Sequence, residues 1–505
     1  MYVRRKRFVC RKEGSSGGSS SFYTGNVDHD DARYNKPDLK KLVLTLGDIA
    51  MILVLVVSIP TVVMFIKPME LMAFRVDPDL QAELSKGNIA NAYIVASLET
   101  NVPIDRVDVL RVWYFGDIKV IKARLSSVSQ LESIIKTSGV ISVYGEKTIR
   151  RAPMYYLSVD EYPNFKDMDI DNEFHKADGI SWTGRNVTVA IIDTGIDYTH
   201  PDFYDADGRS IIKVLVSVLY KDKETGEPLV WVPYVNGSME DLLNLDMQFW
   251  KKYGEPAFLD ICGHGTHVAG IVAGRGWASN GKFKGIAPST DLVIVKAFNK
   301  NGGASIDACL DALNWVYNNT EEYDIEILSM SWGAAFASDG HDPLSMAANK
   351  IAEKGVFVFA AAGNEGNIPT TIMVPAVAEK VFAVGAWDAY YDKLAPFSSI
   401  GTTIDFRMKP DLVASGVMVV SCRSQYVQFS EDYMVGNYYV AMSGTSMATP
   451  AAAGIAADFI EYFRYWYHRD PTMDDFIEWL QHNARHINFV KDFITGYGIP
   501  YAPHT

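Results

Sequence analysis

A serine within a segment of small residues is the first candidate for chemistry in this sequence. Ser446 lies in Gly444–Pro450, which has the sequence GTSMATP, and an apolar run over Ala451–Ile460 follows directly. This order predicts that Ser446 sits at or near the N-terminus of a long buried helix. Free backbone N–H groups and the positive end of the helix dipole could there stabilise an oxyanion. Most serines among small residues are caps or turn residues, so the hypothesis of a nucleophile depends on partners elsewhere.

Two partners of the right type precede Ser446. The apolar run Val187–Ile192 predicts a buried parallel strand, and Asp193 follows at its carboxyl end, where an α/β sheet places functional groups. His264 lies in Gly263–Gly270, which has the sequence GHGTHVAG and opens a second helix of small residues. A serine, a histidine and an aspartate together supply a nucleophile, its base and a group that orients the base.

With these three motifs in the order Asp, His, Ser, the sequence resembles the subtilisin-like serine proteases, or subtilases. The resemblance covers residues 155–505 approximately and implies a three-layer α/β fold, with a mainly parallel sheet flanked by helices. It implies that Ser446 attacks a peptide carbonyl and that His264 carries the proton to the leaving amine. Asp193 would orient the imidazole and stabilise its charged form. This chemistry requires no cofactor.

The resemblance assigns two further parts of the site. Asn364, in the sequence AAAGNEG, matches the side-chain donor of the oxyanion hole. Ser331, Trp332 and Gly333 follow the predicted strand Ile325–Met330 and match the segment that binds substrate at the first specificity pocket. The expected substrates are proteins or peptides.

Two alternatives stay open at this point. A subtilase-like binding or scaffold protein without activity is disfavoured, because all three triad positions and the Asn364 position are filled. An esterase could use the same nucleophile, and the turnover of peptides against esters would separate the two enzymes.

Two groups of residues suggest metal binding. Asp202, Asp205 and Asp207 place carboxylates close together, as Ca²⁺ requires, although turn-forming acids explain them nearly as well. Asp202 matches a position that binds calcium in many subtilases, which makes it the better candidate for a structural calcium ligand. His267 lies three residues after His264, but the glutamate of an H-E-x-x-H site is absent, so we expect a structural hydrogen bond there.

The rest of the catalytic region alternates between apolar strands and amphipathic helices. This alternation predicts a parallel sheet with helices on both faces. From Asp193 to His264 there are 264 − 193 = 71 residues, which indicates an insertion over Lys213–Pro256, either a surface loop or a wall of the cleft. The predicted strands are Leu292–Ala297, Val356–Ala361 and Val381–Ala386, and the predicted helices are Ser305–Asn318, Pro343–Glu353 and Thr472–His486.

Residues 91–150 predict a small separate α+β unit. A helix through Ser138 is expected to start with a capping box of Ser129 and Glu132. The unit resembles the ferredoxin-like propeptide of subtilases, a chaperone and inhibitor, although Glu99–Arg106 is too short for the usual first helix; an unrelated α+β module is the alternative. The predicted strands are Tyr93–Ala96, Val107–Phe115, Ile118–Leu125 and Val140–Val143, with a turn at Gly116 and Asp117.

Residues Thr148–Tyr156 contain Arg150 and Arg151 and are the expected processing region. In subtilases the end of the propeptide lies in the active site and is cut there. The resemblance therefore predicts a zymogen that processes itself and binds its own propeptide, residues 91–150, ahead of a peptidase domain over 151–505.

An apolar segment near the N-terminus predicts a membrane anchor. Ile49–Ile66 is an 18-residue run without a charge, Leu42–Leu46 extends it, and about 20 apolar residues span a bilayer. No small-residue cleavage site follows, so we expect an uncleaved transmembrane helix over 42–67. The basic, Ser/Gly-rich tail 1–41 would be disordered and cytoplasmic, residues 68–90 a linker, and the catalytic domain extracytoplasmic, released by processing.

Charge and cysteine content limit the other possibilities. The net charge of −14 argues against nucleic acid as the main partner. The four cysteines, Cys10, Cys262, Cys309 and Cys422, have no zinc-site spacing. Cys262 lies two residues before His264, and we expect a small buried residue rather than a reactive thiol.

Overall fold

The computed structural model describes residues 75–103, 107–151, 157–167, 182–222, 225–488 and 490–503. The predicted basic tail and the predicted membrane segment 42–67 lie outside these residues. Within the described ranges, no helix has both the length and the apolar character needed to cross a bilayer.

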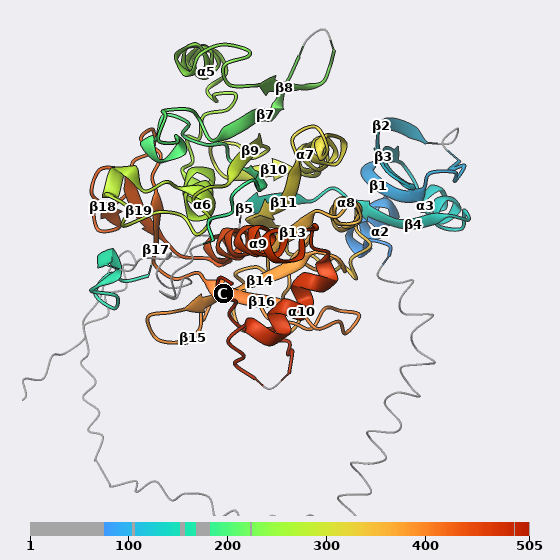
Figure 1. Cartoon of the computed structure of the whole chain (residues 1–505). Coiled ribbons are helices and arrows are strands. Elements are labelled where there is room, and N and C mark those ends of the chain that lie inside the picture. Colours follow the sequence, from blue (N-terminus) through green and yellow to red (C-terminus); the bar gives the residue numbers. More distant parts are fainter. Residues whose placement is uncertain are drawn as a thin grey trace, which may run out of the picture. The chain divides into compact units, whose positions relative to one another are not determined.

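A nine-stranded sheet forms the centre of the molecule (Figure 1). Its strand order is β15-β14-β13-β11-β6-β9-β7-β8, with β16 also paired to β14. All pairs are parallel except those that join the edge strands β15 and β8. The strands are β6 (Thr188–Asp193), β7 (Ile212–Lys221), β8 (Pro228–Trp231), β9 (Asp291–Lys296), β11 (Ile325–Met330), β13 (Phe357–Ala361), β14 (Phe382–Asp388), β15 (Lys393–Leu394) and β16 (Leu412–Ser415).

Both faces of this sheet are buried, which explains why its strands are continuously apolar. In β6, Val189 and Ile191 belong to one core, whereas Ala190 and Ile192 belong to the core on the opposite face. This alternation follows from the two-residue period of a strand.

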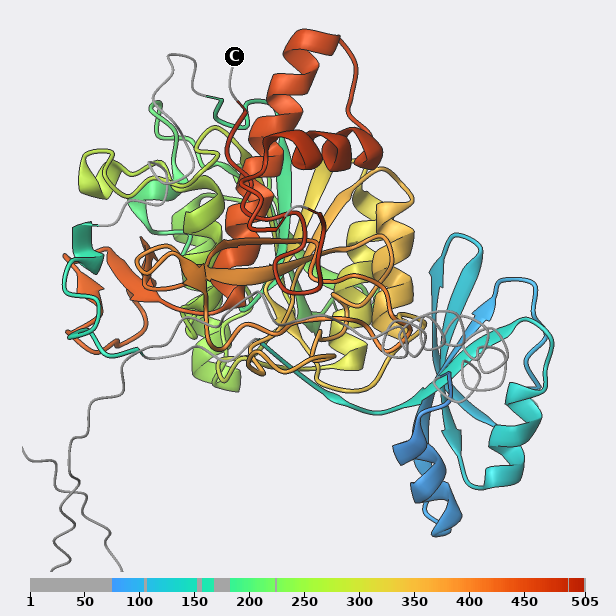
Figure 2. The ribbon, with the colours of Figure 1, turned by 90° about the horizontal axis from the view of Figure 1, so that it is seen from below.

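Helices cover the sheet on both sides (Figure 2). One core includes residues of α6 (His264–Ala273), α9 (Thr445–Tyr467) and α10 (Met473–Asn483). The other includes residues of α7 (Ile306–Asn319) and α8 (Pro343–Ala352). The predicted three-layer α/β fold is confirmed, and the predicted helices and strands occur within a few residues of their expected bounds.

The small N-terminal unit has a four-stranded antiparallel sheet in the order β2-β3-β1-β4. Its hairpin turns at Gly116 and Asp117, as predicted, and Gly116 adopts a positive φ of 58°. Helix α3 (Val128–Ile135) covers one face. The strands are β1 (Ala90–Ser97), β2 (Asp108–Phe115), β3 (Ile118–Leu125) and β4 (Val140–Gly145).

The expected linker 68–90 is wrong over its second half. Pro78–Ser85 forms helix α2, and the side chain of Asp77 caps it by accepting a hydrogen bond from Asp79 N. Leu80 and Leu84, four residues apart, are buried in the same core as α3. Helix α2 therefore supplies a second helix to this unit from the N-terminal side of β1.

The predicted capping box of Ser129 and Glu132 is also wrong. The N-cap of α3 is Ser127, whose side chain accepts a hydrogen bond from Gln130 N. Ser127 has the extended backbone that an N-cap requires (φ −158°, ψ 154°), whereas Ser129 already lies in the first helical turn.

The insertion between Asp193 and His264 is ordered rather than a simple surface loop. Strands β7 and β8 form an antiparallel pair at one edge of the central sheet. Helix α5 (Met239–Tyr253) follows, with a capping box of Ser238 and Asp241 and a left-handed Gly254 at its end.

Candidate active site

The predicted site residues gather at the carboxyl edge of the central sheet. Asp193 is the last residue of β6, and Ser331 directly follows the neighbouring strand β11. His264 is the first residue of α6, and Ser446 is the second residue of α9, so both lie at helix N-termini as expected. Asn364 follows β13, the next strand in the sheet.

His264 and Asp193 form a buried pair. The imidazole Nδ1 lies 2.8 Å from Asp193 Oδ1 and 3.0 Å from Oδ2, and both side chains are almost inaccessible to solvent. Because the carboxylate accepts, Nδ1 is the donor, which leaves Nε2 as the basic nitrogen. Nε2 is buried and has no hydrogen-bond partner among the residues that the structure describes.

The hydroxyl of Ser446 is bonded to Ser331. Ser446 Oγ donates to Ser331 O at 2.9 Å, and Ser331 Oγ donates back to Ser446 O at 2.9 Å. This reciprocal pair ties the start of α9 to the end of β11.

Asn364 is held by the residue that precedes Ser446. Its Oδ1 accepts hydrogen bonds from the backbone N–H and the hydroxyl of Thr445, both at 2.9 Å. These two bonds use the acceptor end of the amide, whose other end is an NH₂ donor.

Asp260 connects the segments that carry Asp193 and His264, and sequence reasoning missed it. The fully buried carboxylate accepts hydrogen bonds from Thr194 Oγ1 at 3.0 Å and Gly263 N at 2.7 Å. It also accepts from the backbone and hydroxyl of Thr266, in the first turn of α6. Burial raises the pKa of Asp260. Its position shortly before the helix of His264 was the only available sequence signal.

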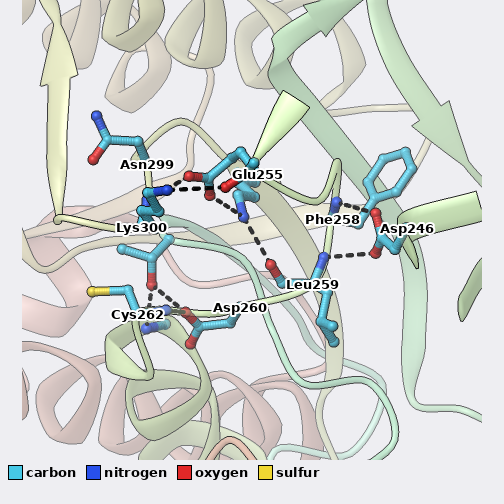
Figure 3. A network of polar contacts seen from close by, with 12 residues as sticks. Asp246, Glu255, Phe258, Leu259, Asp260, Cys262, Asn299 and Lys300 are labelled. Atoms are coloured by element: carbon cyan, nitrogen blue, oxygen red, sulfur yellow. Dashed lines mark hydrogen bonds and ion pairs between the residues drawn. The ribbon is translucent and has the colours of Figure 1, made fainter. Parts of the chain in front are cut away.

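Helix α5 of the insertion is hydrogen-bonded to the residues just before Asp260. Asp246 on α5 is buried and accepts hydrogen bonds from Phe258 N at 3.0 Å and Leu259 N at 2.8 Å (Figure 3). Lys296 donates to Leu259 O at 2.7 Å and forms an ion pair with Glu255 at 3.0 Å. The insertion thus holds the chain that leads into His264.

His267 has the structural role that the sequence predicted. Its Nε2 donates to the carbonyls of Val419 and Val440, each at 3.0 Å. These carbonyls lie on β17 (Val419–Cys422) and β19 (Tyr439–Met442), so the imidazole ties α6 to that small sheet. Burial lowers the pKa of His267 to about 3, and the ring is therefore neutral.

The surroundings of Asp202 do not fit the expected calcium site. Asp202 is buried, accepts hydrogen bonds from Tyr439 OH at 2.6 Å and Ala278 N at 3.0 Å, and faces Cys422 and His200. A thiol and an imidazole are poor ligands for Ca²⁺, which takes oxygen ligands. The other two acids do not join it, because Asp205 Oδ1 accepts from Asp207 N within a local turn.

Trp332 contributes its backbone to the site, and its side chain is buried elsewhere. The indole is buried and packs 5.5 Å from the ring of Phe298, centroid to centroid. The backbone of β12 (Trp332–Gly333) pairs antiparallel with β5 (Thr148–Arg151), the strand that follows the small unit. On its other side, β5 pairs with β10 (Gly303–Ser305), and Arg151 N donates to Gly302 O at 2.9 Å.

Cys262 is a largely buried thiol next to the site. Burial is the main cause that raises its pKa to about 11, with a smaller contribution from the Asp260 carboxylate. The thiol is thus neutral near pH 7, as expected for a packing residue.

Comparison with known proteins agrees with this arrangement. The model of the subtilase family of S8 peptidases matches residues 184–498. The serine protease AprX of Bacillus subtilis (strain 168) is 35% identical, in a match that covers 61% of this chain and 63% of AprX. The thermophilic serine proteinase of Bacillus sp. (strain AK1) is 35% identical over 53% of this chain and 51% of its own length.

Subtilisin E of Bacillus subtilis (strain 168) is 31% identical over 56% of this chain and 58% of its own length. This chain thus spans less than two-thirds of the length of each of these relatives. The family match, however, covers more than half of the chain and contains Asp193, His264, Ser331, Asn364 and Ser446. The chain therefore belongs to the subtilase family, whose members need no cofactor for catalysis.

Proposed function

We propose that the protein is a serine endopeptidase that is made as a membrane-anchored zymogen and processes itself. The observation that carries this proposal is the position of β5. This strand leaves the small unit and lies between β10 and β12, next to the segment whose Ser331 carbonyl accepts a hydrogen bond from Ser446. A peptide that adds a strand in this way is bound by its backbone, as a protease binds an extended substrate.

The chemistry would begin at Ser446. When substrate enters, the hydroxyl exchanges its bond to Ser331 O for one to His264 Nε2, which has no other partner in the described part of the chain. His264 takes the proton while Ser446 Oγ attacks the carbonyl, and Asp193 stabilises the imidazolium. Asn364 donates to the developing oxyanion. The imidazolium then protonates the leaving amine, and water releases the acyl group by the same route.

The small unit would act as the propeptide. It binds the catalytic domain through two acidic residues of α7. Asp307 accepts hydrogen bonds from Tyr93 OH at 2.6 Å and Lys122 Nζ at 2.7 Å. Asp311, which is almost fully buried, accepts from Trp113 Nε1 at 2.7 Å. Charge-assisted bonds of this kind hold the unit so that β5 can reach the substrate-binding strands.

The membrane part of the proposal depends on the sequence of residues 42–67. Since this segment precedes the small unit, cleavage after β5 would separate the catalytic domain from the anchor. The tail 1–41 would face the cytoplasm, and the catalytic domain would face away from it.

The test is to express the full chain and its Ser446→Ala variant and to determine intact masses and new N-termini. We expect the wild type to shorten within residues 148–156 and Ser446→Ala to stay full length. Washed membranes should then release the wild-type catalytic domain but retain the variant.

If both proteins shorten equally, another protease makes the cut. If neither protein shortens and a serine-directed fluorophosphonate does not label Ser446, the protein is a binding or scaffold subtilase. A catalytic domain that stays in washed membranes after the cut would contradict the proposed release.

A further inference from the structure

The space beside Ser446 is bounded by two segments that leave neighbouring strands. Ser331–Gly333 follows β11, and Gly363 with Asn364 follows β13, which pairs parallel with β11. Segment 372–374 crosses between them. Met373 N donates to Ala362 O at 2.9 Å, and Val374 exchanges backbone hydrogen bonds of 3.0 and 3.1 Å with Ala334. Both walls of this space are thus tied to Met373 and its neighbour.

The side chain of Met373 fills the gap between the two glycines of these walls. A Cβ added to Gly363 would lie 2.5 Å from Met373 Cγ and 2.7 Å from Met373 Sδ. A Cβ added to Gly333 would lie 3.0 Å from Met373 Cβ. Met373 is only 7% exposed, so the thioether packs against both walls. Because Gly333 and Gly363 have no side chains, they leave room for the side chain of Met373.

We propose that Met373 is a specificity-determining residue, which limits the enzyme to small side chains at the residue that supplies the scissile carbonyl. This inference rests on the proposed function. The acyl carbon must lie within reach of both Ser446 and Asn364. An incoming strand paired with β12, as β5 is, brings its next residue toward Ser331 and hence toward these two groups. The side chain of that residue then enters between Gly333 and Gly363, where Met373 closes the space.

The occupied space sets the substrate class. Glycine brings no side chain into this space, and alanine and serine bring only a small one, whereas leucine or phenylalanine must displace a buried thioether that is packed on two sides. Discrimination of a side chain by the size of a pocket is typically about 10–200-fold in kcat/KM. In the sequence, the residue that follows β5 is Ala152, which has a side chain of the accepted size.

The test uses the self-processed wild type, Met373→Gly and Met373→Ala with three peptide p-nitroanilides that differ only in the final residue, alanine, leucine or phenylalanine. For the wild type we expect kcat/KM for alanine to exceed that for phenylalanine by at least about tenfold. Met373→Gly should raise the ratio of kcat/KM for phenylalanine to kcat/KM for alanine by at least about tenfold. Met373→Ala should lie between the two.

Met408→Ala is the matched control, because Met408 is 47% exposed, and its substrate ratios should equal those of the wild type. Labelling of Ser446 by a fluorophosphonate shows that each variant retains a formed site. Equal kcat/KM values of the wild type for the phenylalanine and alanine peptides would overturn this inference but not the proposed function. The same holds if Met373→Gly leaves the ratio of these two values unchanged. If the wild type hydrolyses no peptide and is not labelled, the proposed function fails and the inference fails with it.

Discussion

At the scale of single residues, the site depends on an amide and an imidazole whose orientations are fixed by hydrogen bonds to Thr445 and Asp193. Asn364 is the clearest case, because Thr445 holds its acceptor end and turns its donor end into a defined direction. An oxyanion donor is effective when it is oriented before the reaction and needs no rearrangement. The hydrogen bonds to Thr445 are therefore as much a part of the proposed oxyanion site as the amide itself.

Replacing Asn364 by alanine should remove the donor and leave the triad in place. We expect kcat to fall by about 10²–10³-fold with little change in KM, because the lost bond forms mainly in the transition state. Steady-state kinetics on a cleavable peptide would measure this, with Asn318→Ala, on the surface of α7, as the control. A loss confined to KM would show that Asn364 binds substrate instead.

The buried imidazole of His267 should make the fold sensitive to acid. Its folded-state pKa is lowered to about 3, below an unfolded value of about 6.5, so its stabilising contribution is complete above pH 6.5 and is lost as the pH falls toward 3. In this window the contribution of His267 to the free energy of unfolding falls by about 1.4 kcal/mol for each pH unit. Glutamine can keep the hydrogen-bond donor but does not titrate.

We therefore expect the free energy of unfolding of His267→Gln to fall less between pH 7 and pH 4 than that of the wild type. Urea unfolding at both pH values would measure the difference, and His482→Gln, at an exposed position of α10, is the control. Identical pH dependence in the His267 variant and the wild type would show that His267 is not the buried neutral group described here.

At the scale of elements, the insertion contributes to the position of His264. Asp246 on α5 satisfies two buried backbone N–H groups, at Phe258 and Leu259, in the chain that leads to Asp260 and then to α6. Removing the carboxylate leaves both donors without a partner, and each such group costs about 1–3 kcal/mol. His264 should then be less firmly placed.

Asp246→Ala should lower both the melting temperature and kcat, the latter at a temperature where the variant is still fully folded. Thermal unfolding and kinetics normalised to fluorophosphonate-labelled sites would separate the two effects. Glu240→Ala, on the exposed part of the same helix, should change neither. If kcat per labelled site is unchanged in Asp246→Ala, α5 contributes only to stability.

At the scale of the whole molecule, the contact between the small unit and α7 would decide whether this unit remains bound after the proposed cleavage. Asp311 is buried and bonded to Trp113, and it forms an ion pair with Arg111 at 2.5 Å. Loss of one partner from a buried hydrogen-bonded charge pair weakens binding substantially, partly because the other charge is left unpaired.

Asp311→Ala should therefore weaken binding of the cleaved small unit by at least about tenfold and give earlier release of activity. Gel filtration of the processed protein and the lag before peptide turnover would measure the two effects. Asp324→Ala, in an exposed loop of the same domain, is the control. Retention of the small unit in Asp311→Ala would show that its other contacts, including those of Tyr93 and Lys122 with Asp307, suffice to hold it.

The sequence by itself determined the family and the parallel sheet. Three long motifs identify positions that chemistry constrains closely, and the apolar runs of β6, β11 and β13 follow from burial on both faces of a sheet. The helices and strands near these motifs were predicted to within a few residues, since their caps and apolar patterns are local properties of the chain.

Only the tertiary structure decided which polar groups meet across distant segments. Asp246 and Asp260 accept hydrogen bonds from the segment that leads to His264. Asp202 accepts a hydrogen bond from Tyr439, and Met373 lies between Gly333 and Gly363. Apart from the hydrogen bond of Gly263 N to Asp260, these contacts join residues that lie well apart in the sequence, so no spacing rule reports them. Helix α2 was missed for a similar reason: a helix of eight residues is marginal alone and is stabilised by packing against a core that forms elsewhere in the chain.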